Sequence, residues 1–480
     1  MAPNIVVIMS DQHRADMMGC AGDPVVRTPH LDRLAAEGVR FTRANCQGPL
    51  CMPARTSFLT ERYVRDHGVF DNAAEVDDDV PTFLHALREA GYHTAEIGKM
   101  HLWVHGRSKG VARMRPKLEA FGFDEPIETV GKLAAAHIEC EYTDYLRAGG
   151  LYDSYCAHIR ARNYGKGKDN LPMWDATPIP LAPADYIDAW HGRRVADWID
   201  AYDRDRPFFL WVGFPGPHDP WDAPAEALAA YAQAEIPLPC SLEPPDAALG
   251  SDRFRRFVKH FLDFSDSASL TDERIRAVRR AYYANITMID EAIGGIRAAL
   301  ERRGLLDDTW VLYTGDHGEL MGEHRMLAKM LFYDAAVRVP LIVRPPGGTA
   351  PAEVDAIVEQ LDVPATCRTI AQGPEPEGSA GRSLLGYLTG ARRVENPRTV
   401  SVSENYGFAA FETDAHKLVV DEDTLEPCQL FERATDPTED ANLVADPAQR
   451  DTIEALMAEH VRPFFARAPM RRSPLSFAGE

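Results

Sequence analysis

The chain has 480 residues, of which 45% are hydrophobic and 26% are charged. This composition is that of an ordinary soluble globular protein, and the length exceeds the roughly 250–300 residues at which a single core stops growing. The formal net charge of −21 argues against nucleic acid or an anionic membrane as a partner, although a local basic pocket could still bind an anionic substrate.

The N-terminal segment MAPNIVVIMSDQ has no basic region before its short apolar run. It predicts a strand rather than a signal peptide, and no run along the chain has the length of a membrane span. We therefore expect a cytoplasmic protein that does not enter a membrane. The eight cysteines form no CxxC pair and no zinc-site spacing, which predicts free thiols.

Apolar runs rich in β-branched and aromatic residues predict five buried strands, at residues 4–9, 93–98, 207–214, 309–315 and 339–344. Helical patterns lie between these strands. One begins at Thr28 as the N-cap and ends at Gly38, and residues 79–91 follow the same scheme. Residues 272–304 predict a long helix that could break near Gly294 and Gly295. Strands that alternate with helices predict an α/β protein with a mostly parallel sheet covered on both faces.

The sequence changes in character after about residue 370. The stretch GPEPEGSAGRS is a Pro/Gly-rich connection, and short strands are predicted beyond it at residues 417–420 and 428–432. We therefore expect a large α/β domain over residues 1–370 and a smaller α+β domain over residues 371–480.

Polar side chains follow four of the predicted strands. Alone, each of these groups fits ordinary turn chemistry. Ligands of open α/β sheets, however, bind outside the carboxyl ends of the strands, so four such groups together predict a site. The groups are Asp11-Gln12, Lys99 with His101, His218-Asp219 and Asp316-His317.

Part of this set has the chemistry of a metal site. Asp11, Gln12, Asp316 and His317 offer two carboxylates, an amide oxygen and an imidazole. Mainly oxygen ligands favour Ca²⁺, and the imidazole makes Mn²⁺ the alternative. Zinc is disfavoured because no cluster of His or Cys ligands is present.

The remaining candidates are cationic, namely Arg55, Lys99, His101, His218 and Lys329. Such groups can neutralise an oxyanion and protonate a leaving oxygen. Because the chain has no glycine-rich phosphate loop, this set indicates hydrolysis of an anionic ester rather than phosphoryl transfer from a nucleotide.

Cys51 allows four interpretations: a packed core residue, a disulfide partner, a nucleophile, or the precursor of a modified residue. Pro53 favours the first turn of a helix, so Cys51 would lie near a helix N-terminus, where the thiol pKa is lowered. A hard metal, however, is better suited to an oxygen nucleophile than to a thiolate.

The motif CMPAR at residues 51–55 resembles the C-x-[P/A]-[S/A]-R signature of the type I sulfatases, which belong to the alkaline phosphatase superfamily. The resemblance extends from residue 4 to about 444 and implies an alkaline phosphatase-like fold, with the catalytic sulfatase domain in residues 1–370. Further blocks in the expected order are TPHLDRLAAEGVRFTRA, GYHTAEIGKMH, TGDHGELMGEH, VRVPLIVRPPG, QLDVPAT and DPTEDANL.

The resemblance implies a role for each candidate residue. Cys51 would be converted by a maturation enzyme to Cα-formylglycine, which acts as nucleophile and metal ligand and is held by Arg55. One oxygen of its gem-diol would attack sulfur, and loss of the second hydroxyl proton would then expel sulfate. The other metal ligands would be Asp11, Gln12, Asp316 and His317. The sulfate would be bound by Lys99, His101, His218 and Lys329.

Two features resemble the choline-sulfatase and phosphonate monoester hydrolase branch of the family. One is the use of Asp11-Gln12 and Asp316-His317 where many sulfatases have Asp-Asp and Asp-Asn. The other is Asn72, which by resemblance would bind substrate. The end of the chain does not resemble the tail that helps to form the choline pocket. The sequence therefore does not predict the alcohol half of the ester. We expect it to be selected by residues 103–190 and by the C-terminal domain.

The sequence thus predicts a sulfatase that cleaves a small anionic ester and forms a homo-oligomer. One alternative is a hydrolase of phosphonate monoesters or phosphodiesters with the same nucleophile. The other, from a different class, is an inactive anion- or metal-binding protein in which Cys51 is not converted.

Overall fold

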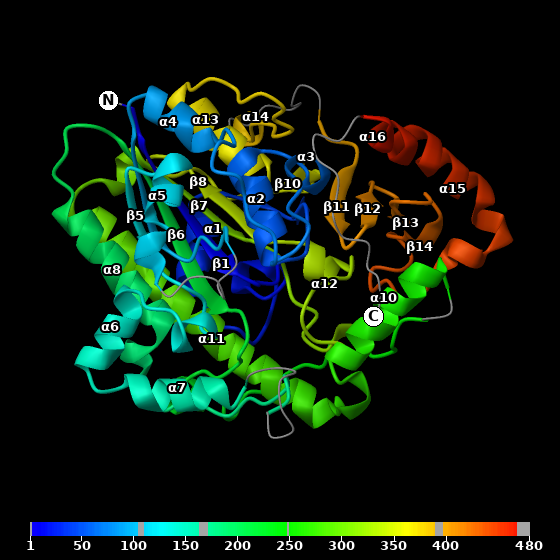
Figure 1. Ribbon diagram of the computed structural model, residues 1–480, viewed down its shortest axis with the longest axis horizontal. Coiled ribbons are helices and arrows are strands. Elements are labelled where there is room, and N and C mark those ends of the chain that lie inside the picture. The colour runs from blue at the N-terminus through cyan, green and yellow to red at the C-terminus, as the bar shows by residue number, and fades with distance from the viewer. Residues whose placement is uncertain (1, 104–109, 163–170, 247–248, 389–396, 468–480) are drawn as a thin grey trace.

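The computed structural model describes residues 2–103, 110–162, 171–246, 249–388 and 397–467, and a large mixed sheet lies at its centre (Figure 1). Its strands, in spatial order, are β5 (Glu125–Glu128), β4 (His93–Gly98), β6 (Phe208–Pro217), β1 (Asn4–Asp11), β7 (Thr309–Gly315), β8 (Leu341–Arg344), β2 (Val39–Phe41) and β9 (Ala352–Val354).

The five strands from β5 to β7 run parallel to one another, and β8 pairs antiparallel with both β7 and β2. All eight residues of the central strand β1 are buried, as expected for a parallel strand that is covered on both faces. The predicted α/β fold with a mostly parallel, mixed sheet is confirmed, and the predicted strands at residues 93–98 and 309–315 have the observed bounds.

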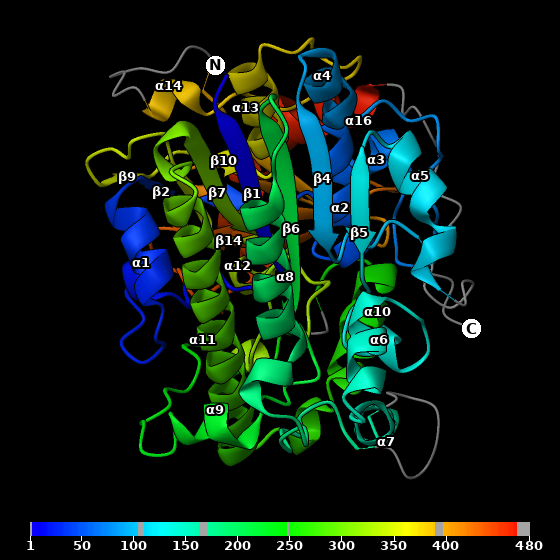
Figure 2. The ribbon, with the colours of Figure 1, turned by 90° about the vertical axis from the view of Figure 1, so that its left-hand side faces the viewer.

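Helices cover both faces of the sheet. In Figure 2 the long helices α8 and α11 lie in front of β6 and β1, and α1 packs on the same side. On the other face α2, α4 and α13 pack against one another and share a core with β1 and β6. The helices of this domain are α1 (Pro29–Ala36), α2 (Cys51–Thr60), α3 (Val64–His67), α4 (Phe83–Glu89), α5 (Arg115–Ala120), α6 (Glu141–Ala148), α7 (Tyr152–Arg160), α8 (Ile187–Ala201), α9 (Ala225–Ala229), α10 (Asp252–Phe264), α11 (Asp272–Arg302), α12 (Asp334–Val337) and α13 (Asp362–Ala371).

Helix α11 is continuous from Asp272 to Arg302, so the break that the sequence allowed near Gly294 and Gly295 does not occur. Gly294 instead permits a close approach between helices, since a Cβ atom there would lie 2.5 Å from the ring of His30 in α1. Glycine weakens a helix by only about 1 kcal/mol relative to alanine, and packing of the buried face of α11 outweighs that loss.

A second, antiparallel sheet follows in the C-terminal part of the chain. One of its faces packs through Phe408 and Val419 into the core that contains α2, and the other is covered through Phe411 and Leu418 by the last two helices. This arrangement matches the smaller α+β unit that was predicted, while its boundary at residue 370 stays a prediction. The elements are β11 (Ser401–Asn405), β12 (Phe408–Glu412), β13 (His416–Asp421), β14 (Pro427–Glu432), α14 (Leu385–Leu388), α15 (Arg450–Leu456) and α16 (Arg462–Ala466).

Three smaller observations complete the fold. The short strands β3 (Ala44–Asn45) and β10 (Val358–Glu359) pair with each other beside the main sheet. All eight cysteines are free thiols. Among the described residues, no helix combines the length and apolar character needed to cross a membrane.

Candidate active site

The four strands that the sequence assigned to the site are neighbours in the sheet, in the order β4, β6, β1 and β7. They run parallel, so their carboxyl ends meet at one edge. Asp11 is the last residue of β1, and Lys99, His218 and Asp316 each follow the end of their own strand directly. The structure therefore brings the predicted residues together, as the strand-end pattern indicated.

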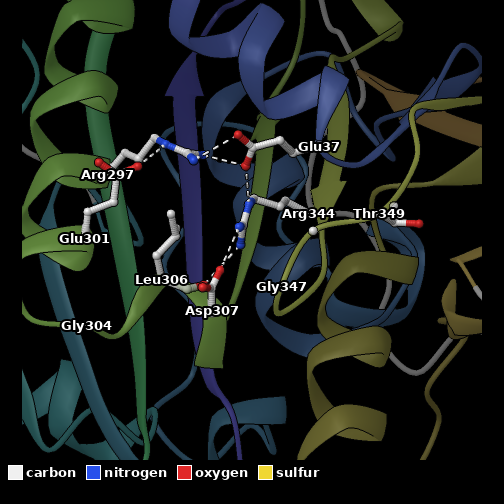
Figure 3. A pocket seen from close by; sticks show the side chains of 10 residues that line it. Glu37, Arg297, Glu301, Gly304, Leu306, Asp307, Arg344, Gly347 and Thr349 are labelled. Atoms are coloured by element: carbon white, nitrogen blue, oxygen red, sulfur yellow. Dashed lines mark hydrogen bonds and ion pairs between the residues drawn. The ribbon is translucent and has the colours of Figure 1, made fainter.

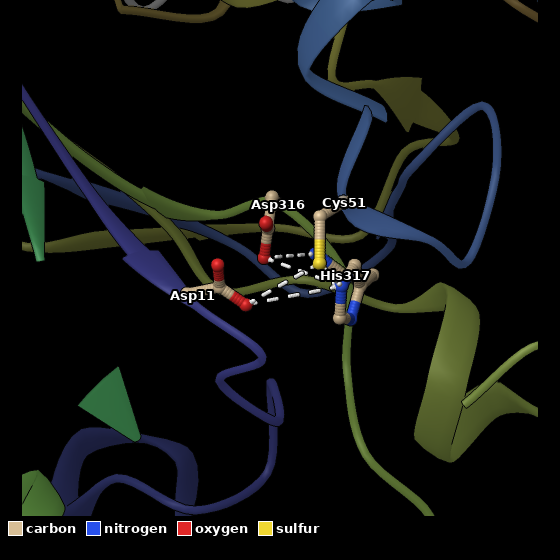
Figure 4. Close-up of side chains that lie close together, drawn as sticks. All are labelled: Asp11, Cys51, Asp316 and His317. Atoms are coloured by element: carbon tan, nitrogen blue, oxygen red, sulfur yellow. Dashed lines mark hydrogen bonds and ion pairs between the residues drawn. The ribbon is translucent and has the colours of Figure 1, made fainter. Parts of the chain in front are cut away.

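Four side chains at this edge converge on one point (Figure 4). The potential ligand atoms of Asp11, Cys51, Asp316 and His317 all lie within 4.8 Å of one another, and all four residues are buried. Nε2 of His317 lies 3.3 Å from Sγ of Cys51 and 3.8 Å from Oδ1 of Asp316. Its other nitrogen, Nδ1, is 2.9 Å from the carbonyl oxygen of Gly318. This second contact orients the ring with Nε2 toward the cluster, as in metal-binding histidines.

The charges around Asp11 keep its carboxylate ionised. Burial alone would raise its pKa, but Lys99, His218 and Arg55 together hold the pKa well below the ordinary value. Nε of Arg55 donates to Asp316 at 2.8 Å and Nη2 donates to Asp11 at 3.1 Å. The guanidinium therefore fixes both carboxylates and partly offsets their charge.

The cluster fits a divalent cation. It offers two fully buried carboxylates, one oriented imidazole nitrogen and the side chain of Cys51. Buried carboxylates are normally paired or bound to a metal, and Arg55 and Lys99 engage only Oδ2 of Asp11 and Oδ2 of Asp316. The Oδ1 atoms of both residues face His317, and that of Asp316 also accepts the main-chain N–H groups of Gln12 and His317. Carboxylate oxygens turned toward one point suit a hard cation.

Gln12 lies beside the cluster with a positive φ of 68°. Its amide nitrogen in the main chain donates to Oδ1 of Asp316 at 2.8 Å. Its side chain is shared between two other groups, because Lys329 donates to Oε1 and Nε2 donates to Glu319. The predicted role of Gln12 as a metal ligand stays a prediction.

The cationic residues surround the same edge. Lys99 forms an ion pair with Asp11, and Nζ of Lys329 lies 2.8 Å from Nε2 of His218. The other ring nitrogen of His218 lies 2.8 Å from the carbonyl oxygen of Asp219. His101 is 8% exposed, two residues beyond Lys99, and its main-chain N–H donates to Glu128. All the predicted cations thus lie at or next to the strand ends.

Cys51 is the first residue of α2, and every residue of this helix is buried. The N-cap residue, Leu50, has no side-chain acceptor, and Oδ1 of Asn72 accepts a hydrogen bond from the Met52 N–H at 3.0 Å instead. The amide oxygen of Asn72 therefore caps the helix that carries Cys51. The predicted role of Asn72 in binding substrate stays a prediction.

Two buried residues support the site although the sequence pattern did not select them. Glu319 accepts from Gln12 and, at 3.1 Å, from the Met321 N–H, and burial raises its pKa to about 8. Lys132 donates to the carbonyl oxygen of Pro220 at 2.7 Å, just beyond His218. Glu319 could have been found from its place two residues after His317, whereas Lys132 follows no strand end that marks it.

A pocket lies away from this edge of the sheet. It has a volume of about 590 Å³ and is bordered by Glu37, Arg297, Asp307 and Arg344 (Figure 3). Asp307 precedes β7 and Arg344 ends the antiparallel β8, so the pocket lies at the opposite end of the strands. Arg344 and Arg297 both pair with Glu37, at 2.8 and 2.9 Å. These arginine charges are already matched, so the pocket is not a competing anion site.

Comparisons with known proteins agree with this geometry. The family model "Sulfatase" matches residues 3–373, and the model "N-sulphoglucosamine sulphohydrolase, C-terminal" matches residues 322–463. The chain belongs to the sulfatase family. The sulfatase is 31% identical to the choline-sulfatase of Rhizobium meliloti over 457 residues, which cover 93% of this chain and 83% of that protein. It is 29% identical to the uncharacterized sulfatase YidJ of Escherichia coli over 463 residues, with coverage of 92% and 83%.

Among solved structures, the phosphonate monoester hydrolase SpPMH from Silicibacter pomeroyi matches with a TM-score of 0.81 and 26% identity. The match covers 97% of this sulfatase and 96% of that chain. The resemblance to the branch of choline-sulfatases and phosphonate monoester hydrolases is therefore confirmed, as is the alkaline phosphatase-like fold. The chain is an enzyme of the sulfuric ester hydrolase class.

Proposed function

We propose that this sulfatase cleaves a sulfate ester to an alcohol and sulfate, after a maturation enzyme converts Cys51 to Cα-formylglycine. The observation that carries the proposal is the position of the Cys51 side chain. Sγ lies 3.3 Å from His317 Nε2 and 3.8 Å from Asp11 Oδ1, inside the group that fits a metal. The hydrated aldehyde would supply an oxygen nucleophile, and a bound divalent metal, Ca²⁺ or alternatively Mn²⁺, would act as a Lewis acid toward the ester.

The acidic half of the site would hold the metal. Asp11, Asp316 and His317 are its proposed ligands together with residue 51, and Gln12 is the proposed fifth ligand. The two contacts from Arg55 to the Oδ2 atoms keep the Oδ1 atoms of both carboxylates directed at the cluster. Burial at 0% exposure for Asp11, Asp316 and His317 excludes water from this side of the site.

The cationic half binds the sulfate group. Lys99 and Lys329 donate to the sulfate oxygens and stabilise the charge that increases on them in the transition state. The leaving oxygen takes its proton from Nε2 of His218 when the ring is doubly protonated, and Nδ1 then donates to the carbonyl oxygen of Asp219, 2.8 Å away. His101 assists this transfer, and the NH₂ group of Asn72 contacts the substrate.

Two measurements test the proposal. Mass spectrometry of the tryptic peptide that ends at Arg55 should show formylglycine in place of cysteine when the protein is made with its maturation enzyme. That protein should hydrolyse sulfate esters, and Cys51→Ala and Cys51→Ser variants should lose at least about 1000-fold in kcat. A native peptide that carries only an unmodified thiol would instead support the inactive anion- or metal-binding protein.

The second candidate function is hydrolysis of phosphonate monoesters or phosphodiesters. It is favoured by the pairs Asp11-Gln12 and Asp316-His317 and by the similarity to SpPMH. Side-by-side kinetics on an aryl sulfate and an aryl phosphonate monoester separate the two functions. A larger kcat/KM for the phosphonate would exclude the sulfate ester as the preferred substrate.

We expect the enzyme to be cytoplasmic and homo-oligomeric, which fractionation of the native host and analytical ultracentrifugation can test. Its proposed partners are the small anionic ester and the maturation enzyme.

A further inference from the structure

The turn between β11 and β12 has an unusual residue for its geometry. Tyr406 and Gly407 are the two turn residues, and both have positive φ angles, of 49° and 79°. A two-residue hairpin turn of this kind favours Asn, Asp or Gly at the first position. A bulky aromatic residue in the left-handed region is an outlier that costs on the order of 1 kcal/mol or more, and such outliers cluster at functional sites.

The strained turn is fixed by its surroundings. Nη2 of Arg253, from α10, donates to the carbonyl oxygens of Tyr406 at 3.1 Å and Gly407 at 3.0 Å. The same arginine pairs with Asp421 at 3.2 Å, and its guanidinium lies 4.8 Å from the ring centroid of Phe408. These contacts define the position of the turn relative to α10.

The turn lies next to the chain segments that carry two site residues. The Glu404 N–H donates to the carbonyl oxygen of Gln47 at 2.8 Å, four residues before Cys51. A Cβ atom on Gly48 would come within 2.9 Å of the Glu404 carbonyl oxygen, so only glycine allows this approach. The C-terminal sheet is therefore packed directly against the segment that leads to Cys51.

On the other side the turn contacts the segment that follows Lys329. Nδ2 of Asn405 donates to the carbonyl oxygen of Met330 at 2.8 Å, and the Met330 N–H donates to Pro49 at 3.1 Å. Asn405 is fully buried. The residue before Tyr406 therefore links the approach to Cys51 with the residue after Lys329.

The Tyr406 side chain is half-buried and packs on α10. Its ring centroid lies 5.8 Å from that of Phe257 and 6.2 Å from that of Phe261. Burial first, and then the charges of Asp71 and Cys51, raise the pKa of its hydroxyl to about 12 against the effect of Lys329. The hydroxyl is therefore a neutral hydrogen-bond donor that lies within the electrostatic field of the site.

Packing on α10 explains an aromatic ring here but not its place at a left-handed turn position, where Asn, Asp or Gly would carry less strain. We propose, on the basis of the function proposed above, that Tyr406 contacts the alcohol half of the ester. The β11–β12 turn is then the part of the C-terminal sheet that selects the alcohol, and it favours one with a ring or an oxygen acceptor.

The test uses formylglycine-containing enzyme with Tyr406→Asn, which suits the turn, and Tyr406→Phe, which removes only the hydroxyl. The probes are 4-nitrophenyl sulfate, glucose 6-sulfate and ethyl sulfate, with inorganic sulfate as a competitive inhibitor. Tyr406→Asn should raise the KM of the first two esters at least fivefold and change the KM of ethyl sulfate and the Ki of inorganic sulfate less than twofold. Tyr406→Phe should raise the KM of glucose 6-sulfate more than that of 4-nitrophenyl sulfate.

Tyr387→Phe is the matched control, since this half-buried tyrosine packs on Phe41, 5.7 Å between ring centroids, in the same part of the chain. Equal changes for all three esters, or no change for any of them, would overturn the proposal. Calorimetric binding of 4-nitrophenyl sulfate and inorganic sulfate to the same variants separates this result from a failure of the proposed function. An enzyme that turns over no sulfate ester contradicts the function, whereas unchanged binding of 4-nitrophenyl sulfate contradicts the role of Tyr406.

Discussion

Nζ of Lys329 lies 2.8 Å from Nε2 of His218, although 111 residues separate the two in the chain. An ammonium group can only donate, so Nε2 accepts and the ring proton is on Nδ1, which faces the Asp219 carbonyl oxygen. Lys329 therefore holds His218 in the tautomer and orientation that direct Nε2 into the site. Its own pKa is raised, because Cys51, Asp219 and Asp11 together outweigh the effect of burial.

Replacing Lys329 by Met should remove both the charge near the sulfate and the partner of His218. We expect kcat/KM for a sulfate ester to fall by roughly 100- to 1000-fold and the Ki of inorganic sulfate to rise. Steady-state kinetics with formylglycine-containing enzyme measure both quantities. Lys259→Met, at an exposed position of α10, is the control that should leave them unchanged. An unaltered Ki in Lys329→Met would show that this lysine does not bind the sulfate.

Lys132 should position the segment that carries His218. Its Nζ donates to Pro220 at 2.7 Å and to the Tyr186 hydroxyl at 3.1 Å, and it lies 3.9 Å from Asp222. Lys132→Met removes these contacts and takes one basic partner from the buried carboxylate of Asp222, which keeps His158 at 3.1 Å. We therefore expect a loss of about 2 kcal/mol in the free energy of unfolding.

The displaced His218 should also lower kcat about tenfold in this variant, since a shift of about 1 Å can have such effects. Chemical denaturation and kinetics measure the two changes, with Lys259→Met as the control. If Lys132→Met loses stability but keeps the wild-type kcat and pH profile, the lysine has only a structural role.

Removal of the divalent metal should lower the melting temperature. Asp11 and Asp316 converge with their Oδ1 atoms on one point, and a bound cation stabilises only the folded state that brings them together. At a ligand concentration 100 times Kd the gain is about 2.7 kcal/mol. The melting temperature is measured after chelation and again after addition of Ca²⁺ or Mn²⁺. The ion that raises it more at equal concentration is the one that binds more tightly.

Asp316→Asn should abolish the metal-dependent shift, whereas Asp252→Asn, at an exposed position of α10, should retain it. A wild-type melting temperature that responds to neither ion would contradict the metal site.

Glu128 should make stability depend on pH. Burial raises its pKa from 4.5 to about 8, and the neighbouring Glu96 also has a raised pKa. The folded protein therefore binds a proton more tightly than the unfolded chain. This stabilisation is complete below pH 4.5 and is lost as pH rises through about 8, at up to about 1.4 kcal/mol per pH unit.

Glu128→Gln should reduce the slope of the free energy of unfolding between pH 5 and 8. Glu119→Gln, at an exposed position in α5, should leave the slope as in the wild type. Urea denaturation across this range provides the measurement. An unchanged slope in Glu128→Gln would show that Glu128 does not cause the pH dependence of stability.

The strands and the residues at their ends could be predicted from the sequence because the signals are local. The run IVVIM within β1 is apolar throughout, as expected for a strand buried on both faces, and Asp11 is the last residue of that strand. Parallel strands then place the residues that follow them at one edge. This reasoning located Asp11, Lys99, His218 and Asp316 without any knowledge of the strand order.

Gly294 shows where a local signal misleads. Glycine lowers helix propensity, which allowed a break, but the contact with His30 of α1 decides the outcome. Propensity contributes about 1 kcal/mol at such a position, whereas the packing of a long buried helix involves many side chains.

Local sequence thus determined which residues lie at the edge of the sheet, because apolar periodicity and strand ends are properties of short segments. The tertiary structure alone decided which atoms meet there. Gln12 lies between Lys329 and Glu319, and Lys132 anchors the segment beyond His218. These contacts join residues from 88 to more than 300 positions apart, and such contacts are set by how the helices and the two sheets pack rather than by any short segment.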